Sequence, residues 1–311
     1  MIRALLAALL AVVMTGCGPE RIPPPSTPAP ALATPGAAIP ADLDVAVRLD
    51  LERIRSALGQ AALARLREQA AASAGREPEL SRMMADLLLA SKTIWVALRP
   101  NANPAHIDNV VILSGHFADV DPRTYALTPR FGPAIDLGGG WRMYERQGVK
   151  ERVEPARLYA RGDELIVLAS TAEIDSMERQ LEQRAGDEHV EPADKGVVSF
   201  AARAPALARW VEDRSVTVAR MLDKGRSVSG FASLEAAGLE AEVELGFEQE
   251  EHAQAVGEAL GELARSIRGL GSVAESISKG LSVEVVGRSV VLRLRLSSEV
   301  LATAIAAEEP K

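Results

Sequence analysis

The chain has 311 residues, 47% of them hydrophobic and only 4% aromatic, with a formal net charge of -8 and a single cysteine. The acidic balance argues against a nucleic-acid partner and against adsorption of the folded body to anionic lipid surfaces, because both partners are negatively charged. One thiol also cannot form an internal disulfide, so the stability of the fold must come from its core.

The first sixteen residues have the layout of a secretory signal peptide. Arg3 supplies one positive charge, and it is followed by an unbroken apolar run over residues 4–14 and then by two small residues. As a helix, this segment would reach only ~20 Å, which is short of the ~30 Å hydrocarbon core of a bilayer. We therefore expect residues 1–16 to be removed rather than kept as a membrane span.

The stretch Met14-Thr15-Gly16-Cys17 resembles the lipobox of bacterial lipoproteins. In that family the cysteine is acylated on sulfur, with palmitate or a similar chain, and becomes the new N-terminus after cleavage. Met14 departs from the pattern, which most often has leucine there. The resemblance covers only the signal region, and it implies lipidation of Cys17 and attachment to a membrane. The alternative is a cleaved, secreted protein whose cysteine is incidental.

The resemblance also implies a location in the bacterial cell envelope. Gly18 follows the cysteine, whereas an aspartate at that position retains lipoproteins in the inner membrane of some bacteria. The implied location is therefore the outer membrane, with the body facing the periplasm or the exterior.

Residues 17–40 are expected to comprise the lipidated cysteine and a proline-rich tether. Proline fixes φ and lacks a backbone donor, so such a segment favours an extended polyproline conformation that advances ~3.1 Å per residue. A ligand for a proline-reading module is the alternative. Prolines occupy positions 19, 23, 24, 25, 28, 30, 35 and 40.

The rest of the chain contains a weak internal repeat. "PADLDVAVRLDLERIRSAL" from Pro40 is similar to "PADKGVVSFAARAPALARW" from Pro192, and "RLYARGDELIVLASTAEID" from Arg157 is similar to "SVEVVGRSVVLRLRLSSEV" from Ser282. The two matches occur in the same order. They predict an α+β fold of two related units, residues 41–188 and 189–311, each an antiparallel sheet with helices packed on one face.

Apolar spacing predicts the helices of both units. One helix begins at Leu51, others cover residues 80–88 and 256–267, and a single long helix runs between Pro205 and Gly225. Ser170 and Glu173 fit a capping box at the start of another helix. Gly257 and Gly261 are expected to permit close approach of their helix to the sheet, since nearby glutamates exclude a lipid setting.

Strict alternation of apolar and polar residues over 239–247 and 290–296 predicts strands with one buried face and one wet face. If these strands share a sheet, their charged residues lie on the same solvent face, where opposite charges contribute ~0.2 to 1 kcal/mol per pair. Binding of a cation or a basic partner by the glutamates is the alternative. By contrast, residues 109–115 are apolar on both faces. The charged residues are Glu240, Glu242, Glu244, Glu248, Arg293 and Arg295.

The residues do not form a recognisable catalytic set, and we expect neither enzymatic activity nor a cofactor. The nearest approach to a metal-assisted hydrolytic site is the group His106, His116, Asp119 and Asp121, whose spacing matches no established ligand pattern. Asp121 before a proline fits a helix N-cap instead. The glycines at 138–140 fit a turn better than a phosphate cradle.

Two tryptophans on predicted strands, Trp95 and Trp141, are candidates for lining a ligand surface, although such residues more often belong to the core. The leading hypothesis is a lipid-anchored, non-enzymatic binding or scaffolding protein with an envelope protein as partner. A carrier or sensor of an apolar ligand such as lipid is the second hypothesis, and a metal-assisted hydrolase is the third.

Overall fold

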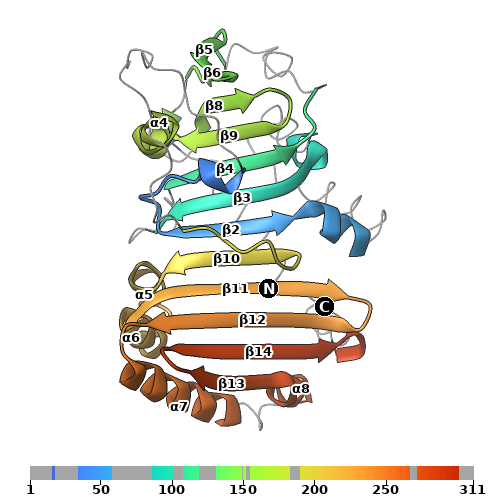
Figure 1. Cartoon of the computed structure of the whole chain (residues 1–311), viewed down its shortest axis with the longest axis vertical. Coiled ribbons are helices and arrows are strands. Elements are labelled where there is room, and N and C mark those ends of the chain that lie inside the picture. Colours follow the sequence, from blue (N-terminus) through green and yellow to red (C-terminus); the bar gives the residue numbers. More distant parts are fainter. Residues whose placement is uncertain are drawn as a thin grey trace. The chain divides into compact units, whose positions relative to one another are not determined.

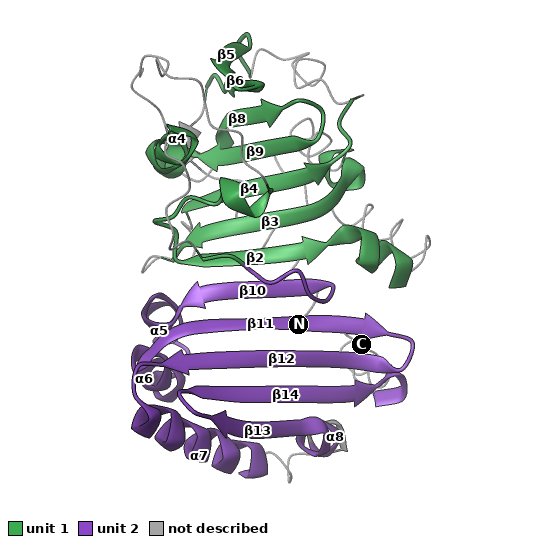
Figure 2. Cartoon of the chain, in the orientation of Figure 1, with its two compact units in different colours: residues 1–191 green, residues 192–311 purple. Residues whose placement is uncertain are grey.

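The computed structural model describes residues 16–17, 34–57, 86–100, 108–118, 131–148, 150–151, 155–182, 190–266 and 272–300. The chain divides into two compact units, unit 1 over residues 1–191 and unit 2 over residues 192–311 (Figure 2). We expected the boundary after residue 188. Both units are built on antiparallel sheets with helices, so the predicted α+β class is confirmed.

The sheet of unit 1 is antiparallel throughout, in the order β2-β3-β4-β9-β8-β6-β5 (Figure 1). Its strands are β2 (Val45–Asp50), β3 (Ser91–Arg99), β4 (Asp108–Gly115), β5 (Ile135–Gly138), β6 (Trp141–Glu145), β8 (Pro155–Arg161) and β9 (Leu165–Ser170). A separate two-residue ladder pairs β1 (Gly16–Cys17) with β7 (Lys150–Glu151). The glycine turn expected between β8 and β9 is present, with Gly162 at a φ of 56°.

The structure describes five helical segments in unit 1. They are η1 (Gly36–Ala38), residues 51–57, residues 86–90, η2 (Thr171–Glu173) and α4 (Ile174–Glu182). The helix expected from Leu51 is present, and Asp50 caps it by accepting the N–H of Arg53 at 2.9 Å. The predicted capping box is wrong: Ser170 Oγ makes no cap and accepts the N–H of Asn109 at 3.2 Å.

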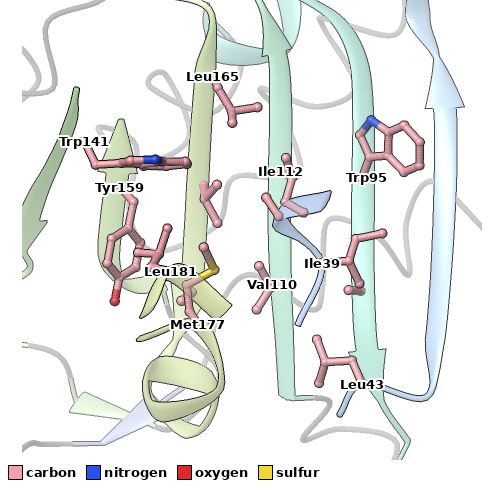
Figure 3. Packing of buried hydrophobic residues seen from close by; sticks show 14 of the residues in the cluster. Ile39, Leu43, Trp95, Val110, Ile112, Trp141, Tyr159, Leu165, Met177 and Leu181 are labelled. Atoms are coloured by element: carbon pink, nitrogen blue, oxygen red, sulfur yellow. The ribbon is translucent and has the colours of Figure 1, made fainter. Parts of the chain in front are cut away.

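The sheet of unit 1 is buried on both faces. All six residues of β9 are buried, as are the first six of β4, although successive side chains point to opposite faces. Figure 3 shows the cluster on one face, which Met177 and Leu181 of α4 cover together with Ile39 and Leu43. The apolar run over residues 109–115 therefore predicted a doubly covered strand correctly.

The sheet of unit 2 is also antiparallel, in the order β13-β14-β12-β11-β10 (Figure 1). Its strands are β10 (Val198–Arg203), β11 (Gly225–Glu235), β12 (Gly238–Phe247), β13 (Leu281–Val286) and β14 (Ser289–Ser297). The predicted alternation over 239–247 and 290–296 thus corresponds to two neighbouring strands.

Four helices pack on unit 2's apolar face: α5 (Ala204–Val211), α6 (Val216–Asp223), α7 (Glu250–Ser266) and α8 (Ser272–Gly280). The single helix expected between Pro205 and Gly225 is wrong. Residues 212–215 separate α5 from α6, and Ser215 Oγ caps α6 by accepting the N–H of Val218 at 3.4 Å. The apolar spacing continues across residues 212–215, so the sequence pattern did not reveal the break between the two helices.

The two glycines of α7 differ in role. A Cβ on Gly257 would lie 2.3 Å from Val285 Cγ2, so this glycine does allow α7 to approach β13 closely. A Cβ on Gly261 would meet nothing within 4 Å. The predicted role in helix-to-sheet packing therefore holds at the first position only.

The two units share one order of connections. Each unit has a first strand, then helical segments, then a first hairpin, and later a second hairpin whose last strand pairs with the last strand of the first hairpin. In unit 1 these are β2, β3–β4 and β8–β9, and in unit 2 they are β10, β11–β12 and β13–β14. Unit 1 inserts β5 and β6 where unit 2 has α7 and α8. A duplication would produce this pattern, and the internal repeat itself stays a prediction.

Candidate functional site

The predicted anchor, Cys17, lies in the short β1–β7 ladder, in which its backbone is opposite Lys150. Residues 1–15 of the signal region and residues 18–33 of the tether fall outside the described part of the chain. Lipidation of Cys17 therefore stays a prediction.

The chain joins unit 1 through a segment that we call the strap, residues 36–43. Ala38, Ile39 and Leu43 of the strap are fully buried in the main cluster of unit 1. We expected the tether to reach Pro40, but the fold begins earlier. Proline content alone did not distinguish the spacer from the strap, whose three alanines, Ile39 and Leu43 supply its apolar side chains.

Asp42 of the strap is the centre of a charged cluster. Its Oδ2 accepts hydrogen bonds from Ser176 Oγ at 2.9 Å, Arg99 Nη2 at 3.0 Å and Arg179 Nη2 at 3.0 Å. Burial acts to raise the pKa of Asp42, but these three donors outweigh it and hold the pKa below its ordinary value. The carboxylate is therefore kept ionised against α4 and the end of β3.

Arg99 extends this cluster into the fold. Its Nε and Nη2 donate hydrogen bonds to the buried carboxylate of Glu173 at 2.9 and 3.2 Å. Its Nη1 donates to the backbone carbonyl of Asp42 at 3.0 Å. These contacts raise the pKa of Arg99, with the hydrogen bond to Glu173 as the largest cause. A planar guanidinium suits such a two-pronged contact.

A second charged cluster fastens α4 to β8. The side chain of Arg157 is only 4% exposed, donates Nη1 to Glu178 of α4 and lies 3.9 Å from Glu145. Burial raises the pKa of Glu178, although Arg157 partly opposes that effect. Burial likewise raises the pKa of the Tyr159 hydroxyl, which lies deep in the same region. These groups act as an internal ion pair that positions the helix.

Neither cluster was found from the sequence. Asp42 lies in the "PAD" opening of the repeat, but nothing in the local sequence reveals partners that are 57, 134 and 137 residues away. The sequence pattern around Arg157 predicts a strand residue and does not indicate a buried ion pair. The only signal was the capping-box glutamate, Glu173, which is buried and binds Arg99 instead of a helix terminus.

The candidate metal ligands are not brought together by the part of the chain that is described. His106, Asp119 and Asp121 fall outside it, whereas His116 is exposed, with Nδ1 at 3.6 Å from Asp163 Oδ2. Among the described residues, no group of three or more acidic, histidine or cysteine side chains is arranged to hold a metal ion. Metal analysis of the purified protein is the direct test of this hypothesis.

The two tryptophans of unit 1 belong to its core. Trp141 is fully buried and Trp95 is 7% exposed, and both lie in the main cluster (Figure 3). The Arg48 guanidinium lies 5.7 Å from the centre of the Trp95 ring, a cation–π distance. The ligand-surface interpretation is therefore replaced by the core interpretation.

The glutamate row of unit 2 pairs across strands as predicted. Glu240 and Glu242 of β12 lie opposite Arg295 and Arg293 of β14, and each pair approaches to 2.7 Å. Arg293 Nη1 also contacts Glu284 of β13 at 2.7 Å. Because these carboxylates already have cationic partners, the row is better suited to holding strands in register than to binding a cation.

Within the described ranges, no helix is both long enough and apolar enough to cross a membrane.

Comparison with known proteins gives only a distant likeness. No protein-family model and no curated protein matches the chain. Crystal forms III, I and IV of the protein TP0453 are similar in fold, at 8%, 9% and 9% sequence identity, with TM-scores of 0.46, 0.45 and 0.45. The matches cover 88%, 89% and 88% of this chain and 98%, 99% and 96% of TP0453. A likeness of this size carries no functional argument.

Proposed function

We propose that the chain is a lipid-anchored protein of the bacterial cell envelope, and that its two units form a non-enzymatic binding or scaffolding body. The observation that carries this proposal is the position of the only cysteine, Cys17, directly after an apolar run and small residues. Two or three acyl chains hold a protein far more firmly than one, because each buried methylene contributes ~0.8 kcal/mol.

The start of the fold supports this arrangement. The strap begins at Gly36, so the chain between Cys17 and Thr34 is available as a spacer of ~50 Å in a polyproline conformation. Such a spacer would let the body stand clear of the bilayer surface. Cleavage before Cys17 would also remove Gly16 and dissolve the two-residue ladder with β7.

The test is a mass measurement on the mature N-terminus. Protein extracted from the membranes of a bacterium that processes lipoproteins should begin at residue 17 and carry the added mass of its acyl groups. The Cys17→Ser variant should lose that mass and leave the membrane fraction. A mature chain with an unmodified Cys17, free in the medium, would overturn the proposal. Separation of inner and outer membranes then locates the anchored protein.

The incomplete burial of apolar side chains in unit 2 favours a second candidate function, the carriage of an apolar ligand. Val243, Leu292 and Val283 lie on the face that carries the helices, and all three are only half-buried. Partly exposed aliphatic side chains on three neighbouring strands would give an acyl chain an apolar surface on which to lie.

Native mass spectrometry of protein purified from its own membrane tests this second function. A lipid that copurifies with the wild type, and that is lost when Val243 and Leu292 are both changed to Asn, would support it. A ligand-free wild-type protein in repeated preparations would remove the carrier function and leave the anchor proposal intact.

A further inference from the structure

The strap is attached to unit 1 in a way that differs from every strand of the sheet. Its backbone makes local hydrogen bonds: Ile39 N donates to Gly36 O at 3.0 Å, and Leu43 N donates to Pro40 O at 3.1 Å. No residue of the strap lies in a strand of the sheet, and Asp44, which follows it, donates its N–H to Leu98 O at 3.1 Å. The strap can therefore leave without breaking a ladder of the sheet.

Side-chain hydrogen bonds to two elements help to hold the strap, and the Glu191 side chain packs against Gly36 at its start. Asp42 binds Arg99 at the end of β3 and Ser176 and Arg179 of α4, and Gln180 Nε2 of α4 donates to Ala37 O at 2.8 Å. The side chains of Asp42 and Arg179 are 43% and 53% exposed, so water can replace their contacts when they separate.

We propose that the strap is a releasable element of unit 1, which opens while the sheet and α4 stay folded and which is held closed by the Asp42 cluster. The inference rests on the proposed function in one respect, since an anchor at Cys17 makes the strap the first part of the fold to receive any pull from the membrane. The strap thus sets how firmly the body is coupled to its tether.

Opening has a definite structural consequence. Ile39 and Leu43 are fully buried and lie beside Val110 and Ile112 on the apolar face of the sheet (Figure 3). Their removal would uncover part of that face next to Trp95, while Met177 and Leu181 of α4 would still cover the rest. A closed strap hides this apolar surface, and an open strap offers it to water or to an apolar partner.

Hydrogen exchange of the full chain tests whether the strap opens by itself. In the wild type, the amides of Ile39, Leu43 and Asp44 should exchange faster than those of Ile112 and Val167, which open only with the sheet. In Asp42→Asn, the strap amides should exchange ~10-fold faster again, while the sheet amides stay unchanged. Asp163→Asn is the matched control, since Asp163 lies in the β8–β9 turn, where its Oδ2 is 3.6 Å from His116 Nδ1; it should alter neither set.

Two results would overturn the proposal. The first is equal exchange of strap and sheet amides in the wild type, which would mean that the strap opens only with global unfolding. The second is an equal acceleration of both sets in Asp42→Asn, which would make Asp42 a general stabilising residue.

A pulling measurement tests the mechanical consequence. Cys17 of the unacylated chain supplies one thiol handle, and Glu164→Cys in the β8–β9 turn supplies the other. The wild type should show a first extension of ~25 to 30 Å, the length of the eight strap residues, before unit 1 unfolds. The force of that step should fall in Asp42→Asn. Unfolding of unit 1 in a single step would contradict the proposal.

These experiments separate the two proposals. Neither of them uses the acyl group, so failure of the strap to open would leave the lipid anchor standing. Conversely, an unmodified Cys17 in native membranes would remove the source of the pull and leave the exchange result valid.

Discussion

In unit 1, β9 buries every one of its residues, whereas in unit 2 most residues of β12 and β14 are only half-buried. The order of strand connections is shared, so the difference lies in what covers the sheets. Unit 1 has apolar side chains on both faces, while unit 2 has apolar side chains under its helices and charged pairs on the other face. The same order of strands therefore accommodates a sheet that is buried on both faces, in unit 1, and a sheet with one buried and one solvent-exposed face, in unit 2.

Truncation of one leucine in each unit should give the largest contrast. Leu168→Ala in β9, where the side chain is 1% exposed, should lower the free energy of unfolding by about 3 kcal/mol. Leu292→Ala in β14, which is half-buried, should cost about 1 kcal/mol. Urea denaturation, followed by hydrogen exchange of strand amides in each unit, measures both values. Equal losses would show that unit 2's apolar face is as well covered in solution as the core of unit 1.

The glycines of α7 test how closely unit 2 packs where it is covered. Gly257→Ala should destabilise unit 2 by about 1 to 2 kcal/mol, because its Cβ would overlap Val285 Cγ2 and the stiff valine cannot easily yield. Gly261→Ala should stabilise it by about 0.5 to 1 kcal/mol, since helix propensity improves and nothing obstructs the methyl group. Thermal unfolding of the two variants measures both effects, and a stabilising Gly257→Ala would refute the close contact.

The charge on Asp42 should make the stability of unit 1 depend on pH. Because the pKa of Asp42 is lowered in the folded state, its contribution is fully present above the ordinary aspartate pKa and is lost as the pH falls through the folded-state value. Asp42→Asn should therefore cost about 1 kcal/mol at pH 7, and this cost should shrink below pH ~4. Denaturation of wild type and variant across pH 2.5 to 7 checks the sign, with Asp163→Asn as control. A cost that grows towards low pH would contradict it.

The ion pairs on unit 2's solvent face should have the smallest effect. Arg295→Ala should cost about 0.5 kcal/mol at low salt and less in 1 M salt, because its contact with Glu240 is exposed and screened. The exchanged pair, Glu240→Arg with Arg295→Glu, should restore most of the loss. Failure of the exchange to restore stability would mean that the register depends on packing rather than on charge.

Much of unit 2 was predictable because one face of its sheet is wet. Alternation over residues 239–247 and 290–296 is visible only when polar and apolar neighbours differ, and that condition holds in β12 and β14. The same pattern placed the glutamates and arginines on one solvent face, whereas the particular pairs Glu240–Arg295 and Glu242–Arg293 come from the register of β12 and β14. The break between α5 and α6 was missed because Ser215 acts through a cap and leaves the apolar spacing intact.

The charged clusters of unit 1 were not predictable by such reasoning. Local patterns report which residues are buried, but they do not say which distant side chain meets which. Asp42, Arg99 and Glu173 come from three separate parts of the chain, and only the folded sheet brings them together. The metal-ligand and lipidation hypotheses depend on residues or side chains outside the described part of the chain.

The contacts of Arg99 have a consequence for the order in which unit 1 matures. One guanidinium joins residues 42 and 173, so the first residues of the unit are secured only after its last helix has been synthesised. Contacts this far apart in sequence form late and slow the folding of a domain. The N-terminal strands of unit 1 therefore cannot complete these contacts until residue 173 has been synthesised.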